Sequence, residues 1–112
     1  MTEDISFDQW KKLDLRVGEI LEVEDHPQAD RLYVLKVDVG GEERTLVAGL
    51  REHYEKDELL GKKVIVFTNL KPVDLRGVTS QGMVLAAVEE GDEETVVLLT
   101  PEEDIASGAK IR

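Results

Sequence analysis

The chain has 112 residues, of which 41% are hydrophobic and 35% charged, and its formal net charge at pH 7 is −11. This length suits one domain with a modest core, and no apolar run approaches the roughly 18 residues that a membrane-spanning helix needs. Because the chain has no cysteine, disulfides, thiolate zinc sites and cysteine nucleophiles are excluded, and we expect a cytoplasmic location with no membrane partner.

The N-terminal segment carries a helix-start pattern followed by a strand pattern. Ser6 and Gln9 have the spacing of a capping box, with apolar residues at the two positions of a hydrophobic staple. Apolar residues then alternate over residues 13–17, which predicts a strand. Gly18 shifts the parity of this alternation. A shift at a glycine predicts a β-bulge there, of the kind that bends a strand around a closed barrel.

The middle of the chain contains the clearest strand pattern. Residues 33–39 alternate between apolar and polar side chains, as in a half-buried strand. Two consecutive glycines follow and predict a tight hairpin into a second strand at 45–48. Residues 50–60 are polar with a few apolar points, which predicts a helical connection that ends at Gly61.

Three more strands are predicted in the second half, at 64–67, at 83–88 and, after a glycine turn, at 96–99. Residues 100–103 repeat the capping-box pattern and predict a single helical turn. Short strands at roughly 10-residue spacing with one helical connection favour a small barrel over a sandwich.

We therefore predict an all-β fold: a five-stranded OB-fold barrel with a short helical connection and terminal extensions. Residues 1–112 form one domain in this interpretation, with its core at about 13–88. The terminal segments have more apolar surface than a five-stranded barrel requires. We expect them either to cover the open end of the barrel or to form a dimer with a second copy.

The sequence contains no catalytic constellation. Of its two histidines, His26 lies in a turn among acidic residues, where bonding to the local backbone is favoured over metal binding. His53 falls on the polar connection, where we expect exposure to solvent. Phosphate-loop, dinucleotide and serine-elbow motifs are absent, and the acidic clusters lack ordered ligand spacing. We predict a non-enzyme without a metal or other cofactor.

The charge is distributed unevenly along the chain. The blocks 1–30, 31–60 and 86–112 carry net charges of −6, −2 and −6, whereas residues 61–85 carry +3. This positive block contains a polar loop, 69–83, with glycines near both ends of its central part. Because the surrounding acidic surface repels polyanions, a basic loop against it favours a local anion-binding site.

The residues of this loop suit contact with a nucleic-acid backbone. Lys71 and Arg76 provide cations for phosphate, and Asn69 and Ser80 provide neutral groups for phosphate and sugar oxygens. Met83 starts an apolar strand, and its place at the mouth of that strand makes it a candidate for contact with a base. An ordinary polar loop rich in turn residues is the alternative interpretation.

Five motifs follow one another between residues 13 and 87. They are Leu13-Asp14-Leu15-Arg16-Val17-Gly18, His26-Pro27-Gln28-Ala29-Asp30-Arg31-Leu32, Ala48-Gly49-Leu50, Leu60-Gly61-Lys62-Lys63-Val64, and Asn69-Leu70-Lys71-Pro72 through Arg76-Gly77 to Ser80-Gln81-Gly82-Met83. With these motifs in this order, the chain resembles the tRNA-binding domain found at the C-terminus of methionyl-tRNA synthetases, as their separate β subunit, and as free-standing tRNA-binding proteins.

The resemblance implies an OB-fold that holds tRNA by its shape, at the outer corner of the L, with little reading of the anticodon. It also implies a homodimer and a partnership with the catalytic subunit of methionyl-tRNA synthetase. Carried over by position, the tRNA contacts are Arg31, Asn69, Lys71, Arg76, Ser80 and Met83.

The resulting hypothesis is structure-specific tRNA binding, as the β subunit or accessory domain of that synthetase. Export or secretion chaperones share the fold, so binding of unfolded polypeptide is the alternative. A third possibility is an assembly subunit that tethers a synthetase through its termini.

Overall fold

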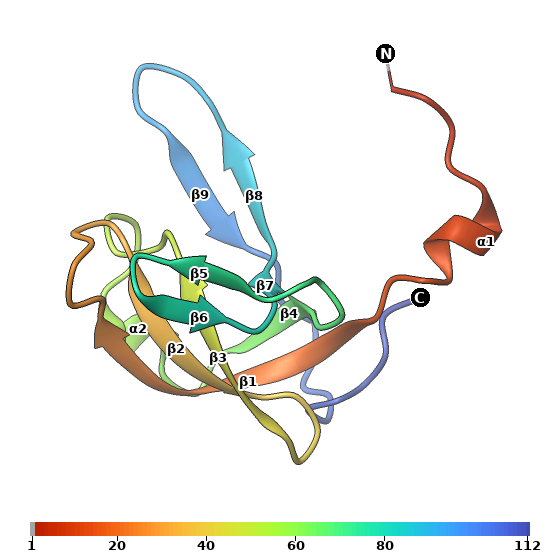
Figure 1. Ribbon diagram of the computed structural model, residues 1–112, viewed down its shortest axis with the longest axis horizontal. Helices are drawn as coiled ribbons and strands as arrows, with labels where there is room; N and C mark the ends of the chain where they lie inside the picture. The colour runs from red at the N-terminus through yellow and green to blue at the C-terminus, as the bar shows by residue number, and fades with distance from the viewer. Residues whose placement is uncertain (1) are drawn as a thin grey trace.

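The computed structural model describes residues 2–112. Its centre is a five-stranded antiparallel sheet in the order β3-β2-β1-β4-β7, which curls into the barrel seen in Figure 1. The edge strand β3 also contacts β7, so the two edges of the sheet approach each other and the barrel is nearly closed. These features confirm the predicted OB-type barrel. The strands are β1 (Leu15–Asp25), β2 (Tyr33–Asp38), β3 (Glu43–Ala48), β4 (Lys63–Phe67) and β7 (Met83–Val84).

The core lies inside the barrel and is filled by alternate residues of its strands. Leu35 and Val37 on β2, Leu46 on β3, and Val64 and Val66 on β4 are all fully buried. Their spacing of two residues is the spacing of side chains on one face of a strand. The alternation read from the sequence at 33–39 is therefore confirmed, as are the strands at 45–48 and 64–67.

The predicted bulge at Gly18 is wrong in position. The register of β1 against β2 shifts between Ile20 and Glu22, a few residues later. Gly18 keeps a regular register and lies where a Cβ would come within 2.6 Å of Val37 and 3.0 Å of Val66. Glycine is required there because the barrel interior leaves no room for a side chain.

Along β1 the buried side chains change from the odd to the even positions. This change comes from the C-terminal tail, which runs beside the first half of the strand. The amide of Val17 donates to Ala109 (2.9 Å), and the amides of Gly108 and Ile111 donate to Val17 (2.7 Å) and Leu15 (2.9 Å). Leu15 and Val17 are buried but lie outside the core cluster. The strand thus buries one set of side chains away from the barrel core and the next set inside it.

Two short helices flank the barrel, and the prediction was right for one of them in detail. In α1 (Phe7–Trp10) both capping-box bonds between Ser6 and Gln9 are present. The connection predicted as helical over 50–60 consists mostly of turns, with one short helix, α2 (Lys56–Leu59), before Gly61. Among the described residues, no helix has the length and apolar character that crossing a membrane requires.

The predicted helical turn at 100–103 is wrong, because this segment is bent but not helical. It leads directly into Asp104 and Ile105, whose carboxylate and carbonyl oxygens both accept from the Lys63 ammonium. Attachment to Lys63 on β4 therefore takes the place of the local bonds that a capped helical turn would make.

Beside the five-stranded sheet are two hairpins: β8–β9 projects away from it in Figure 1, whereas β5–β6 lies across it in this view. The sequence analysis predicted neither of them as a separate hairpin. The loop predicted at 69–83 contains a hairpin of β5 (Val73–Leu75) and β6 (Val78–Ser80). The strand predicted at 83–88 breaks after β7, and its second part, β8 (Ala86–Glu89), pairs with β9 (Thr95–Leu98). The break lies at Leu85, whose amide and carbonyl are bonded to Ile65 and Leu99.

Candidate nucleic-acid interface

The β5–β6 hairpin turns through two residues, Arg76 and Gly77. Both have positive φ, 57° and 92°, and they separate the paired residues Leu75 and Val78. A two-residue turn with positive φ at both positions matches the right-handed twist of the strands. Arg76 is the one non-glycine residue of the described chain in this region of φ, a conformation that costs an ordinary side chain about 1–2 kcal/mol. The turn thus holds a cationic side chain, exposed, at the tip of the hairpin.

We call the loop of residues 69–83, which includes the β5–β6 hairpin, the rim. Its two cations, Lys71 and Arg76, are both exposed. Neither takes part in any of the ion pairs found within residues 2–112. The nearby carboxylate of Asp74 accepts from the amide of Gly77 at 2.8 Å and so closes the turn. Half of the chain's cations, in contrast, are paired with carboxylates: Lys11, Arg16, Arg31, Arg44, Arg51, Lys56 and Lys63.

Asn69 uses both ends of its amide on the backbone that enters β1. Its Oδ1 accepts from the amide of Asp14 at 2.8 Å, and its Nδ2 donates to the carbonyl of Lys12 at 2.7 Å. The side chain therefore fastens residues 12–14 to the start of the rim. Its predicted contact with tRNA stays a prediction and would have to share these bonds.

Ser80 is also engaged inside the protein. It is 4% exposed; its Oγ accepts from the amide of Val47 at 2.9 Å and donates to the carbonyl of Gly82 at 2.9 Å. These bonds attach the base of the hairpin to β3. For this hydroxyl to donate to tRNA, its bond to the Gly82 carbonyl would have to be given up.

Met83, at the end of the loop 69–83, and Lys12, whose backbone lies beside the start of that loop, are both exposed. Met83 begins β7, pairs with Phe67 and is 43% exposed, as its predicted place at a strand mouth requires. Lys12 is exposed, and its carbonyl is held by Asn69. Sequence reasoning missed Lys12 because the block 1–30 is strongly acidic. No local signal reveals a contact between residues 57 positions apart.

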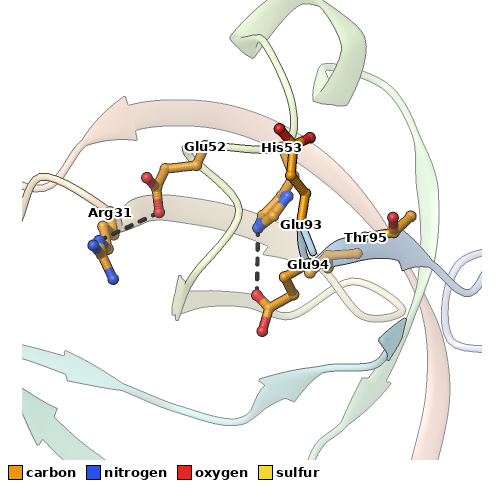
Figure 2. A pocket seen from close by; sticks show the side chains of 7 residues that line it. Arg31, Glu52, His53, Glu93, Glu94 and Thr95 are labelled. Carbon is orange, nitrogen blue, oxygen red and sulfur yellow. Dashed lines mark ion pairs between the residues drawn. The ribbon is translucent and has the colours of Figure 1, made fainter. Parts of the chain in front are cut away.

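Arg31 lies in a different environment, the pocket shown in Figure 2. Its Nε is 3.3 Å from Glu52 Oε1, and the pocket also contains Glu93 and Glu94. His53 lies 3.7 Å from Glu94 and its side chain is only 20% exposed, so the expectation of an exposed histidine was wrong. The structure thus places Arg31 among carboxylates, whereas the other predicted contacts share the hairpin and its base.

The carboxylate of Asp14, the residue whose amide donates to Asn69, is stabilised in its charged form by its surroundings. The Oγ1 of Thr68 donates to Asp14 at 2.6 Å and lowers the pKa of that carboxyl, an effect to which Arg16 and then Lys110 add. Arg16 Nε donates to the same carboxylate at 2.9 Å. The charge of Asp14 is therefore used to join the N-terminal entry, β4 and the C-terminal tail.

His26 is buried beneath the hairpin. Its Nδ1 accepts from the amide of Gln28 at 3.0 Å, which confirms the predicted bond to the local backbone. Its Nε2 also lies 2.8 Å from the carbonyl oxygen of Leu75, in the hairpin. Across residues 2–112 no three His, Asp or Glu side chains are grouped to hold a metal ion.

Residues 15–110 match the family model described as "Putative tRNA binding domain". The chain belongs to this family. It is 58% identical over 110 residues to the methionine–tRNA ligase of Thermococcus kodakarensis, an alignment that covers 98% of this chain and 14% of that protein. The chain thus spans about one seventh of the length of this curated relative.

Two solved structures have the same fold over nearly the whole of both chains. The MetRS related protein from Pyrococcus horikoshii superposes with a TM-score of 0.89 and 36% identity, covering 99% of this chain and 100% of that one. The chaperone CsaA from Bacillus anthracis superposes with a TM-score of 0.86 and 28% identity, covering 98% and 100%. The family's barrel, with both terminal extensions, is therefore shared by proteins of two different descriptions.

Proposed function

We propose that this chain is a non-catalytic module that binds folded tRNA in the cytoplasm and serves a methionine–tRNA ligase as a subunit or accessory domain. Its family membership and its identity to such ligases support this function. The observation that carries it is the pair of exposed, unpaired cations, Lys71 and Arg76, on a hairpin rim of an otherwise acidic protein.

In this proposal the recognition is electrostatic and geometric. Lys71 and Arg76 contact phosphates, and Lys12 adds a third cation beside Asn69. Met83 packs on an exposed base or ribose at the strand mouth. A small number of fixed cations suits recognition of the shape of the backbone, because phosphate contacts carry no base sequence.

We further propose that a second copy packs against the terminal segments. Helix α1 has no buried residue and projects from the barrel in Figure 1, with Phe7 69% and Trp10 37% exposed. These side chains and Ile111 line a groove of about 450 Å³. An isolated four-residue helix is unstable in water, so packing against a partner would account for its presence. A dimer would present two rims, and simultaneous contacts would raise the affinity for one tRNA.

Binding of unfolded polypeptide is the second candidate function. The likeness to chaperone CsaA and the exposed apolar side chains of the terminal segments favour it. It assigns no role to the unpaired cations of the rim. Polypeptide binding through apolar surface also predicts little dependence on salt, because no counterions are released.

The deciding experiment measures binding to full-length tRNA and to an isolated acceptor minihelix, with unfolded protein as a competitor. We expect retention of full-length tRNA, no displacement by unfolded protein, and a log–log salt slope of about −2 to −3, since each phosphate contributes roughly 0.7–0.9. A slope near zero, or displacement by the unfolded protein, would favour the second candidate.

A further inference from the structure

Two hydrogen bonds hold the tip of the β5–β6 hairpin to the barrel. His26 Nε2 lies 2.8 Å from the carbonyl oxygen of Leu75, and Arg76 Nη1 donates to the carbonyl of Gln28 at 3.2 Å. Within the described chain, these are the hydrogen bonds that join residues 74–77 to residues outside the hairpin. His26 and Gln28, which form these bonds with the hairpin, both belong to the loop between β1 and β2.

The two bonds differ in how well they can persist once an anion arrives. The Arg76 bond is long and exposed, and a guanidinium bonds more strongly to a phosphate than to a neutral carbonyl. A phosphate would therefore draw Arg76 away from Gln28. The His26 bond is shorter, and its ring is only 4% exposed, so it is shielded from the same competition.

The ring of His26 is fixed in one tautomer by its neighbours. Because the amide of Gln28 donates to Nδ1 at 3.0 Å, the proton of the neutral ring lies on Nε2 and points to Leu75. The backbone amide of His26 donates to Leu32 at 3.1 Å, which closes the loop at the end of β1. The ring is thus a rigid link between the barrel wall and the hairpin tip.

We propose that His26 is a positioning residue for tRNA binding: it holds the hairpin tip, and through it Arg76, in the orientation that meets a phosphate. This inference rests on the proposed function. A hairpin tip that is already fixed loses less conformational freedom on binding, and this preorganisation raises affinity without any direct contact. Sequence reasoning assigned His26 only its local bond, because Leu75 is 49 residues away.

Two matched substitutions of His26 test the hydrogen bonds of its two ring nitrogens separately. The amide of Gln reaches the place of Nε2, so His26→Gln keeps a donor for Leu75 but removes the acceptor for Gln28. The shorter Asn reaches only the place of Nδ1, so His26→Asn keeps the local bond and loses the bond to the hairpin. Each variant of the full chain therefore loses one hydrogen bond, and we expect similar thermal midpoints for the two.

The proposal predicts different affinities for these variants. His26→Asn should raise the Kd for full-length tRNA about tenfold, and His26→Gln no more than about threefold, because only the former frees the tip. On an Arg76→Asn background, His26→Asn should change the Kd less than about twofold, since the group that it positions is gone. An equal loss of affinity in His26→Gln and His26→Asn would overturn the proposal. So would a tenfold loss from His26→Asn on the Arg76→Asn background.

Failure of this inference is distinguishable from failure of the proposed function. If the unchanged chain retains tRNA, and Lys71→Glu with Arg76→Glu abolishes retention, the function stands. Unaltered binding by His26→Asn would then remove only the positioning role. If the unchanged chain retains no tRNA, both proposals fall.

Discussion

The two hairpins beside the five-stranded sheet are both antiparallel, but their turns are opposite in chemistry. The β5–β6 hairpin exposes Arg76 at its turn, whereas the turn of the β8–β9 hairpin, residues 90–94, contains four acidic residues. Val88 and Val97 on the second hairpin are 54% and 52% exposed. A polyanion is therefore attracted to one hairpin and repelled by the other.

The hairpins also differ in how they are attached. Side chains hold the base and tip of β5–β6 through Ser80 and His26. The β8–β9 hairpin is held at its base, where the amide of Leu98 donates to the Tyr54 hydroxyl at 3.0 Å and Val96 packs on the core. The comparison indicates that the short hairpin, fastened at its base and tip, can orient a charge, whereas the longer hairpin presents an acidic surface.

The sharpest test of this contrast is reversal of charge at the basic tip. Lys71→Glu combined with Arg76→Glu should weaken tRNA binding roughly 100-fold or more, because each charge-assisted bond contributes about 1.5–3 kcal/mol. Both side chains are exposed, so the far-UV spectrum and thermal midpoint should not change. A gel retention assay measures the loss.

The matched control reverses charge on the acidic hairpin instead. Glu90→Lys combined with Asp92→Lys changes the net charge by the same amount with the opposite sign. Retention of tRNA should be unchanged or stronger. If both double variants lose binding equally, the rim has no special part in recognition.

The next largest effect is expected from removing a hydrogen bond that holds one of the hairpins to the barrel. Ser80→Ala leaves the buried amide of Val47 without its acceptor and should lower the free energy of unfolding by about 1–3 kcal/mol, measured in urea. Tyr54→Phe similarly frees the amide of Leu98 on the other hairpin, but should leave tRNA affinity unchanged. Normal stability with lost affinity in Ser80→Ala would instead indicate that the hydroxyl contacts tRNA directly.

Substitution of Arg76 should have a smaller effect, which raises the stability of the fold and lowers the affinity for tRNA. Arg76→Asn creates the Asn-Gly pair that two-residue hairpin turns prefer, and should raise the free energy of unfolding by about 1 kcal/mol by relieving the positive-φ cost. The same change should weaken tRNA binding. A loss of stability together with unaltered affinity would show that the arginine serves the fold and not the ligand.

The smallest expected effect is the pH dependence contributed by Asp14, whose amide donates to Asn69. Its pKa is lowered in the folded protein, so its contribution to stability is present above the unfolded value of about 3.9 and is lost as the pH falls through the folded value. Urea unfolding between about pH 5 and pH 3 should therefore lose less stability in Asp14→Asn than in the unchanged chain. Parallel pH profiles would contradict this role.

Much of the barrel was predictable because its signals are local. The alternation over 33–39, the glycine pair after it and the capping box at Ser6 each depend on residues within a few positions of one another. The errors arose where a distant segment supplied the partner. The bulge was misplaced because the C-terminal tail covers Val17, and 100–103 is not helical because Lys63 binds the residues that follow.

The candidate site divides in the same way. The sequence by itself determined where the positive charge lies, because charge is a property of composition along the chain. It predicted Lys71 and Arg76 as the cations of a polar loop and Met83 as a residue at a strand mouth, where 43% of it is exposed. Only the tertiary structure decided that the side chains of Ser80 and Asn69 hold backbone groups of the protein.

The structure likewise separated Arg31 from the rim, brought Lys12 to it and placed His26 under the hairpin tip. The physical reason is that a polar side chain bonds to whichever unsatisfied backbone group the fold brings beside it. Those groups belong to segments about 20 to 60 residues away, which no local pattern can identify.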